Sequence, residues 1–330
     1  MNAKATSRKS QVSDLSEIMS SIIEELKQTG KYPAVRTYTA TLNSFTQFAG
    51  GKGVKMPVKK IFIYARLKEY QDWLLQKGLS WNSISTYMRT LRAVFNRLFP
   101  HNCKQYDPTL FKGLHTKISS YTKRSLTKAQ MHKLLTTNSD ELPKELQDTL
   151  SYLILMFFFR GMPFIDLIHL RKQDMKGNII VYCRHKTNKP ITVHIPKRVM
   201  LLIKKCQSTE PDSLYLFPFL NKKYANRHSL YNNYLNALHT FNKQLKKLTA
   251  ILLPGIKISS YTIRHTWATL AFHAGASIGI ISKALGHSSI RVTETYLKPF
   301  ENEIIDDMNY KLITSIIKCK KNKPMQYRSL

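Results

Sequence analysis

The sequence is short of acidic residues. It has 20 Asp and Glu residues against 52 Lys and Arg residues, which leaves a formal net charge of +32 and a pI near 10.0. A folded chain with this excess repels itself unless it binds a polyanion, so nucleic acid is the first partner class and an anionic membrane surface the second. Hydrophobic residues at 43% and aromatic residues at 11% exclude a disordered basic tail.

Long apolar runs and paired cysteines are also missing. The longest apolar run spans residues 150–159 and is far shorter than the ~20 residues that cross a membrane. The N-terminal residues are polar and basic, with no hydrophobic signal region. The four cysteines are far apart and form no CxxC pair, which favours free thiols over a disulfide framework or a zinc site. We therefore expect a soluble cytoplasmic protein that associates with DNA and not with a membrane.

Four apolar stripes with helical spacing lie between residues 13 and 100, and each of them stops at a glycine or a proline. Because each stripe needs a partner to cover it, the economical packing is a small helical domain over residues 13–105. Residues 1–12 are then a flexible basic N-terminus. The stripes run from Leu15 to Leu26, from Tyr38 to Phe48, from Leu67 to Leu74 and from Ile84 to Leu98.

The fourth stripe has a polar stripe beside it. Ser85, Arg89 and Arg92 follow one another at i, i+4 and i+7, so they share one side of the helix. Such a cationic side can simply be solvated, but the net charge of +32 favours contact with DNA phosphates. We therefore predict that these three residues bind DNA.

Residues 106–124 lack a clear period and end in a basic run, which indicates a linker. A second domain is expected over residues 125–300, mostly helical but with one interruption. Residues 179–184 and 191–195 are rich in β-branched side chains and flank Thr187–Pro190, which predicts a β-hairpin.

Three short segments of the second domain contain the residues with chemistry. In the first, SSYTIRHTWAT, Tyr261 and Arg264 stand at i and i+3 and project together beside a helical core face. In the second, LGHSS, a helix ends at the glycine, so His287 lies at a turn where its side chain is free to serve a site. In the third, TETY, Tyr296 follows His287 by nine residues.

These segments resemble the tyrosine recombinases, also called phage-type integrases. The resemblance rests on LGHSSIRVTETY, on RHTWAT upstream and on RHKTNK in the hairpin, and it covers the second domain nearly end to end. It implies a mainly α-helical fold with a small β-hairpin or sheet, in which a helical SAM-like core-binding domain precedes the catalytic domain. It also implies a site-specific recombinase, an integrase or invertase of a mobile genetic element, whose partner is double-stranded DNA.

In this family a tyrosine hydroxyl attacks a DNA phosphodiester and forms a 3′-phosphotyrosyl ester, so strands are resealed without a metal, ATP or another cofactor. By resemblance, Tyr296 is the nucleophile, Arg264 the second arginine of the family's pair and His287 its later histidine. Two arginines suit the extra negative charge of the pentacoordinate state, because guanidinium is permanently charged, planar and bidentate. Lys186 matches the hairpin lysine that protonates the leaving 5′-oxygen. Its rivals on the hairpin are Lys189 and Arg184.

Two positions depart from the family pattern. The family usually has His-x-x-Arg where this chain has Tyr261, and because a phenol is a poor base at neutral pH, we expect Tyr261 to bind a phosphate oxygen. The family's first arginine falls on Pro163. Arg160, at the end of the apolar run, needs a partner for its charge, either Asp166 or a DNA phosphate, so we expect it to act as the first arginine. Arg171 is then a surface or DNA-backbone residue.

Beyond the nucleophile, apolar residues recur every four positions from Ile304 to Ile316. Residues 301–330 are therefore expected to form an amphipathic helix and a basic tail. In the resembled family such a helix often docks on the neighbouring protomer and couples active sites. A tetramer of protomers on two DNA sites is the assembly that this implies.

Other functions stay open at this point. A type IB topoisomerase shares the chemistry but relaxes supercoils without partner sites, and a catalytically weakened accessory factor keeps the fold and only binds DNA. Retention of the lysine, the second arginine, the histidine and the tyrosine together argues against the accessory factor. A metal-dependent nuclease is not expected, because His265 and His273 have no carboxylates at ligand spacing. The sequence does not tell integration, excision and inversion apart.

Overall fold

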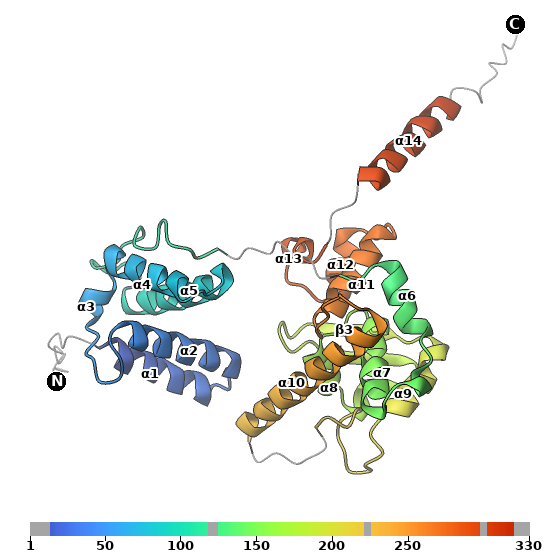
Figure 1. Cartoon of the computed structure of the whole chain (residues 1–330), viewed down its shortest axis with the longest axis horizontal. Coiled ribbons are helices and arrows are strands. Elements are labelled where there is room, and N and C mark those ends of the chain that lie inside the picture. The colour runs from blue at the N-terminus through green and yellow to red at the C-terminus, as the bar shows by residue number, and fades with distance from the viewer. Residues whose placement is uncertain (1–13, 118–124, 221–225, 298–301, 320–330) are drawn as a thin grey trace, which may run out of the picture. The chain divides into compact units, whose positions relative to one another are not determined.

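The computed structural model describes residues 14–117, 125–220, 226–297 and 302–319. These residues fall into two compact units, which Figure 1 draws from blue to red along the chain. The first unit takes residues 1–121 and 225–231, and the second takes residues 122–224 and 232–330. The expected flexible N-terminus, the end of the expected linker and the basic tail lie outside the described residues.

The first unit is a bundle of helices whose ends follow local sequence signals. Asp14 accepts a hydrogen bond from the backbone N–H of Ser16 (2.8 Å) and caps the first helix, and Ser80 caps the last by accepting from the N–H of Ser83 (3.3 Å). Gly78 follows the fourth helix in the left-handed conformation, with φ of 73°. The helices are α1 (Leu15–Gln28), α2 (Tyr32–Phe48), α3 (Val58–Ile61), α4 (Tyr64–Gln76) and α5 (Trp81–Leu98). The four predicted stripes are α1, α2, α4 and α5, whereas the short α3 was not predicted.

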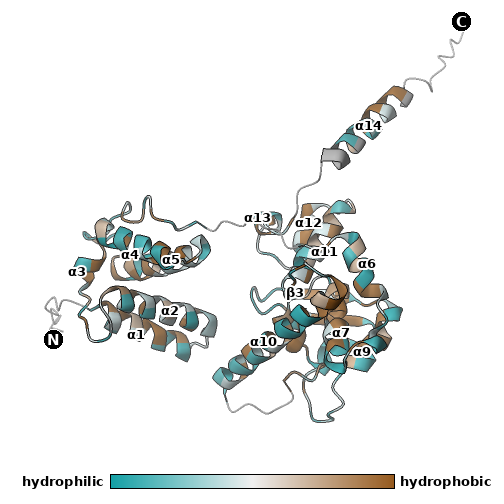
Figure 2. Cartoon of the chain, in the orientation of Figure 1, coloured by the Kyte–Doolittle hydropathy of each residue, from teal (hydrophilic) through white to brown (hydrophobic). Residues whose placement is uncertain are grey.

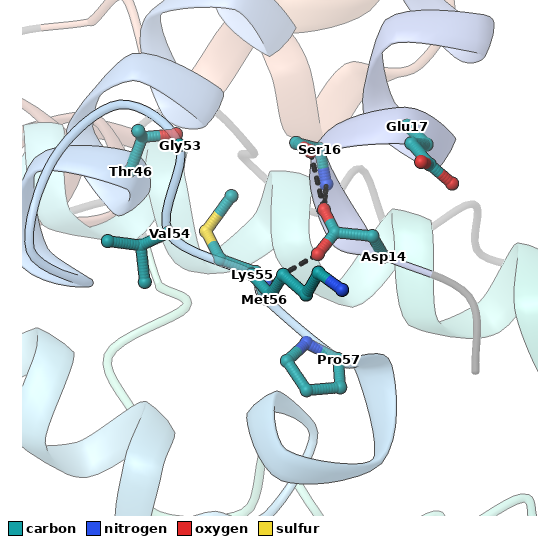
Figure 3. Close-up of a pocket in the computed structure, with 9 residues that line it drawn as sticks. All are labelled: Asp14, Ser16, Glu17, Thr46, Gly53, Val54, Lys55, Met56 and Pro57. Carbon is teal, nitrogen blue, oxygen red and sulfur yellow. Dashed lines mark hydrogen bonds between the residues drawn. The ribbon is translucent and has the colours of Figure 1, made fainter.

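Asp14 also closes one end of the first unit. Its carboxylate accepts a second hydrogen bond from the backbone N–H of Met56 (2.5 Å), and Asp14 forms an isolated antiparallel bridge with Pro57. Figure 3 shows these hydrogen bonds beside a cavity of about 420 Å³. The start of α1 is therefore tied to the segment that precedes α3.

The core of the first unit consists of apolar and aromatic side chains from its longer helices. Tyr70 is fully buried, and its hydroxyl hydrogen-bonds to Oγ of Ser44 (2.8 Å). The same core takes in Leu110, Phe111 and Leu114, which fall inside the expected linker. This part of the segment therefore belongs to the first unit instead of linking it to the second.

One predicted DNA contact is wrong, because α5 buries more of its surface than its apolar stripe indicates. Ser85 is 0% exposed, and its Oγ is buried without a hydrogen-bond partner among the described residues. A serine leaves room for neighbouring helices, and α5 packs against both α2 and α4. Arg89 and Arg92 on the same helix are exposed.

The second unit combines helices with one small antiparallel sheet of order β1–β2–β3. Its strands are β1 (Met175–Lys176), β2 (Ile179–Cys183) and β3 (Pro190–His194). Ile180 of β2 pairs with Val193 of β3, and both are fully buried, so one face of the hairpin packs on the rest of the unit. The predicted hairpin is confirmed, and the short strand β1 was missed.

Helix α7 is the apolar centre of the second unit. Leu153 and Leu155 of α7 are fully buried, helices α6, α9 and α11 pack against it, and Figure 2 shows the ribbon around α7 mostly in brown. The helices of this unit are α6 (Lys128–Thr136), α7 (Lys144–Phe158), α8 (Phe164–Ile168), α9 (Lys197–Cys206), α10 (Arg227–Leu252, from residue 232 on), α11 (Thr262–His273), α12 (Ile278–Ala284), α13 (Ile290–Glu294) and α14 (Asn302–Cys319). Two 3₁₀ turns, Ser139–Glu141 and Lys172–Asp174, complete it. The mainly helical fold with a small sheet is therefore confirmed.

Helix α14 is the amphipathic helix that the sequence predicts. Its apolar side chains Met308, Leu312 and Ile316 are all exposed. Among the described residues, no helix is long and apolar enough to cross a membrane.

Candidate active site

Helix α11 places Arg264 in the interior of the second unit. The side chain is 1% exposed, and its guanidinium donates hydrogen bonds to the carbonyl oxygens of Gly161 (3.0 Å) and Leu285 (2.5 Å). A third contact, of 3.1 Å, joins Nη2 to Nε2 of His287. Burial lowers the pKa of Arg264, and the nearby charge of Arg184 lowers it further. These contacts hold the guanidinium between the Gly161 and Leu285 carbonyls and His287.

His287 lies at the turn after α12, as predicted, and it is 4% exposed. Its Nδ1 is 2.9 Å from Oγ1 of Thr293. Because Arg264 can only donate, Nε2 of His287 accepts, so Nδ1 bears the proton and donates to Thr293. Burial lowers the pKa of His287 to about 3, and the charges of Arg264 and other neighbouring cations contribute. The imidazole is therefore neutral at physiological pH.

Tyr296 follows α13 and stacks into the same site. It is 6% exposed, its ring centroid lies 4.7 Å from that of His287, and Cζ of Arg264 lies 5.8 Å from its ring centroid. The Tyr296 carbonyl accepts a hydrogen bond from Oγ1 of Thr269 (3.3 Å). The predicted nucleophile therefore lies beside both the predicted arginine and the predicted histidine.

The hydroxyl of Tyr261 hydrogen-bonds to the hydroxyl of Tyr296. Tyr261 stands at the N-terminus of α11 and is 43% exposed, so it is the more accessible phenol of the pair. Burial raises the pKa of Tyr261, and the contact with Tyr296 raises it further. Tyr261 therefore keeps its proton, and either hydroxyl can be the donor in the contact with Tyr296.

The loop between β2 and β3 is fastened to the turn that contains His287. Nη1 of Arg184 donates to the carbonyl of Gly286 (2.8 Å), as does Oγ1 of Thr187 (3.1 Å), and Nζ of Lys189 donates to the carbonyl of His287 (2.7 Å). Lys186 at the tip is exposed, and among the described residues its ammonium has no hydrogen bond or ion pair. Arg184 and Lys189, the two alternatives to Lys186, thus both donate to backbone carbonyls, whereas Lys186 does not.

Glycine is required at the turn because the hairpin approaches it closely. Gly286 has φ of 62°, and a Cβ added to it would lie 2.8 Å from Cδ1 of Ile191 and 3.3 Å from Cδ of Arg184. Gly161 plays the same part on the other side, since a Cβ there lies 3.0 Å from Cα of Arg264. Neither position accepts a side chain without displacing the site.

Arg160 lies at the end of α7 in the left-handed conformation, with φ of 60°. It is half-buried, and among the described residues its guanidinium has no hydrogen bond or ion pair. Asp166, one of the two partners expected for Arg160, is not paired with it. Oδ1 of Asp166 accepts from the backbone N–H of His185 (3.0 Å) and lies 3.6 Å from Nδ1 of His185. The structure therefore brings together Tyr261, Arg264, His287 and Tyr296, and it leaves Arg160 outside their hydrogen bonds.

Two residues, Thr293 and Arg184, make contacts within the site that the sequence did not indicate. Thr293 is fully buried and accepts the hydrogen bond from Nδ1 of His287, yet nothing in TETY distinguishes it from Thr295. The sequence marked Arg184 only as a rival of Lys186, because its contact with Gly286 spans 102 positions of sequence. Among the described residues no group of three His, Cys, Asp or Glu side chains is arranged to hold a metal ion.

Two family models match the chain. The SAM-like domain of phage integrases matches residues 14–112, and the phage integrase family matches residues 124–303, which is more than half of the 330 residues. The chain belongs to the phage integrase family. As a tyrosine-type site-specific recombinase, this integrase acts on DNA, and its first and second units are the core-binding and catalytic domains.

Curated relatives match this integrase over most of its length. Tyrosine recombinase XerA of Pyrococcus furiosus is 26% identical over 297 residues, which cover 86% of this chain and 90% of the relative. Tyrosine recombinase XerD of Vibrio cholerae is 23% identical over 256 residues, with coverages of 73% and 80%.

Solved structures share the fold of the integrase. The Tn1549 transposon integrase in complex with transposon right end DNA has a TM-score of 0.63 at 14% identity, covering 91% of this chain and all of that one (100%). The XerH site-specific recombinase bound to its difH substrate has a TM-score of 0.59 at 18% identity, covering 88% of each chain. At these identities the likeness concerns the fold.

Proposed function

We propose that this integrase cuts and rejoins DNA strands through a 3′-phosphotyrosyl bond to Tyr296. The observation that carries the proposal is the contact of one phenol with a buried arginine and a neutral histidine. Arg264 lies 3.1 Å from His287, and both lie against the ring of Tyr296. Such a site supplies a nucleophile, a fixed positive charge and a proton acceptor in one place.

In the cleavage step the Tyr296 oxygen forms a bond to phosphorus while the bond from phosphorus to the 5′-oxygen breaks. The proton of Tyr296 passes to Nε2 of His287, which becomes available when Arg264 turns its N–H groups to the non-bridging phosphate oxygens. Lys186, exposed at the hairpin tip, gives a proton to the leaving 5′-oxygen. Rejoining reverses each transfer, so no net proton and no external energy source is consumed.

Tyr261 is the donor that orients the nucleophile and then a phosphate oxygen. Its hydroxyl already contacts that of Tyr296, and its raised pKa keeps the donor proton in place. The sequence offers Arg160 as a candidate for the family's first arginine, and this assignment is open to a direct test. An Arg160→Ala variant with wild-type cleavage removes it from that role.

Exposed cations of the core-binding domain and an exposed apolar helix suit the wider assembly. Arg89 and Arg92 are exposed on α5 and form no ion pair with any of the described residues, so they can contact DNA phosphates. The exposed apolar residues of α14 suit docking on a second protomer, so we assign to the integrase a tetramer on two DNA sites. A recombinase of this kind works where the cell keeps its DNA, which for a bacterial or archaeal element is the cytoplasm.

The proposal is tested with nicked suicide duplexes made from DNA that flanks the gene. The wild-type integrase should form a covalent adduct without metal or nucleotide, and peptide mapping should place it on the peptide that contains Tyr296. Tyr296→Phe keeps the ring and its packing, so it should abolish the adduct while DNA binding persists. An adduct on Tyr261 overturns the assignment of the nucleophile, and no adduct on any flanking DNA favours a binding factor that lacks catalysis.

A further inference from the structure

Two guanidiniums, not one, are fastened to the turn before the nucleophile. Nη2 of Arg264 donates to the carbonyl of Leu285 (2.5 Å), and Nη1 of Arg184 donates to the carbonyl of the next residue, Gly286 (2.8 Å). Arg184 comes from the end of β2 and Arg264 from α11, so two separate elements deliver their side chains to consecutive peptide groups. Both side chains are buried, with exposures of 4% and 1%.

Neither of these buried charges has an acidic partner. Among the described residues no carboxylate forms an ion pair with Arg184 or Arg264, and Nε of each is buried without a hydrogen-bond partner. The charge of Arg184 also lowers the pKa of Arg264 and of His287, which places it close to both groups. Two unpaired cations in one interior are costly unless an anion joins them.

Arg160 does not share this position. It is half-buried, and among the described residues no hydrogen bond joins its guanidinium to the turn at residues 285–287. Burial raises the pKa of Tyr182, and the charges of Arg264, Arg184 and Arg160 oppose this rise, so Arg160 lies near the site but outside the contacts with the turn. Pro163, where the family places its first arginine, is the uncharged residue that precedes α8. The second arginine in the interior of the site is therefore Arg184, which the hairpin supplies.

We infer that Arg184 is the second guanidinium that holds the scissile phosphate, in place of Arg160. The inference rests on the proposed function. Nη1 of Arg184 stays on the carbonyl of Gly286, and the donors on Nε and Nη2 are left for a non-bridging oxygen of the phosphate, opposite the donors of Arg264. Arg184 thus stabilises the charge that develops when the Tyr296 oxygen bonds to phosphorus and the 5′-oxygen leaves with a proton.

The test compares two substrates that differ in one charge. Both are suicide duplexes of the flanking DNA on which the wild type forms its adduct, one with the ordinary phosphodiester and one with a methylphosphonate at the scissile position. A methylphosphonate lacks one charged non-bridging oxygen, so it needs one guanidinium less. The variants are Arg184→Ala, Arg184→Lys and Arg160→Ala, with Arg198→Ala as an exposed arginine control from α9.

Arg184→Ala should lower the rate of adduct formation on the phosphodiester by roughly 10²–10³-fold, the scale for losing one transition-state donor. On the methylphosphonate it should match the wild type, and Arg184→Lys should fall between the two on the phosphodiester. Arg160→Ala and Arg198→Ala should act alike on both substrates. Gel shifts and thermal unfolding should show DNA binding and folding retained, and if Arg184→Ala is unfolded, Arg184→Lys decides alone.

Equal defects of Arg184→Ala on both substrates mean that Arg184 only positions the turn, and this result overturns the inference. A phosphodiester-specific defect in Arg160→Ala instead of Arg184→Ala assigns the role to Arg160. A wild-type rate for Arg184→Ala on the phosphodiester also refutes it. If the wild type forms no adduct at all, the proposed function itself fails, and the inference falls with it.

Discussion

The two units of the integrase bury their polar groups in different ways. In the core-binding unit the buried polar atoms are neutral, such as the hydroxyl of Tyr70 on Ser44, and they serve packing. In the catalytic unit the interior holds Arg184, Arg264 and Asp166, all at most 4% exposed. Among the described residues neither arginine has an ion pair, and Asp166 lies 3.6 Å from Nδ1 of the more exposed His185. Uncompensated buried charge costs stability, so its presence in one unit only marks where a charged ligand is expected.

The largest effect that sharpens this comparison concerns two glycines in the left-handed conformation. Gly286 has φ of 62° with Cδ1 of Ile191 at 2.8 Å from a Cβ position, whereas Gly78 of the first unit has φ of 73° and nothing within 4 Å. Gly78→Ala should cost about 1–2 kcal/mol for the conformation alone. Gly286→Ala should add about 1–3 kcal/mol for the displaced hairpin.

Urea unfolding of both variants measures this difference, and the rate of adduct formation gives a second readout. Gly286→Ala also displaces Arg184 and His287, so it should lose cleavage, while Gly78→Ala should retain it. Equal free energies of unfolding in the two variants contradict the close approach of hairpin and turn.

The same contrast between the two units explains which features the sequence could predict. Periodicity predicted α1, α2, α4 and α5, because each helix of the first unit buries a simple apolar stripe. Motif spacing found Arg264, His287 and Tyr296, since these residue types are dictated by the chemistry, and the structure brings them together.

The sequence failed where tertiary contact decides. Ser85 is covered by neighbouring helices that its own spacing does not reveal. Leu110 and its neighbours looked like a linker because a segment of turns has no period, although it completes the first core. Arg184 acquires its place only through a turn 102 positions away. Local patterns therefore predict which residues are chemically able to act, and long-range packing decides which of them are positioned to do so.

A smaller effect is expected on the pH dependence of stability. The pKa of His287 in the folded chain is lowered by burial, and then by Arg264 and other neighbouring cations, to about 3, whereas in the unfolded chain it is about 6.5. Between these values the unfolded chain binds a proton that the folded chain does not. The contribution of His287 to the free energy of unfolding is therefore fully present above pH 6.5, and it falls by about 1.4 kcal/mol for each pH unit below that value.

Urea unfolding at pH 7 and pH 5 measures this loss. Burial, and then the neighbouring His185, lower the pKa of His169 to about 4. His169 therefore also makes the folded chain less stable as the pH falls. The variant His287→Gln should therefore show a shallower, but not a flat, decline between the two pH values. Parallel declines in the variant and the wild type contradict a neutral buried His287.

The smallest effect belongs to the surface of the core-binding unit, where charge is solvated and not buried. Arg89 and Arg92 should each contribute one phosphate contact, so each alanine variant should reduce the slope of log affinity against log salt by about 0.9. Near physiological salt this corresponds to a loss of about 1 kcal/mol in binding, and folding should not change. Arg97 on the same helix is a matched control, because its guanidinium is paired with Glu25 (2.5 Å) and is therefore already neutralised. A salt slope that Arg97→Ala reduces as much as Arg89→Ala does would show that the effect comes from overall charge and not from a DNA-facing side of α5.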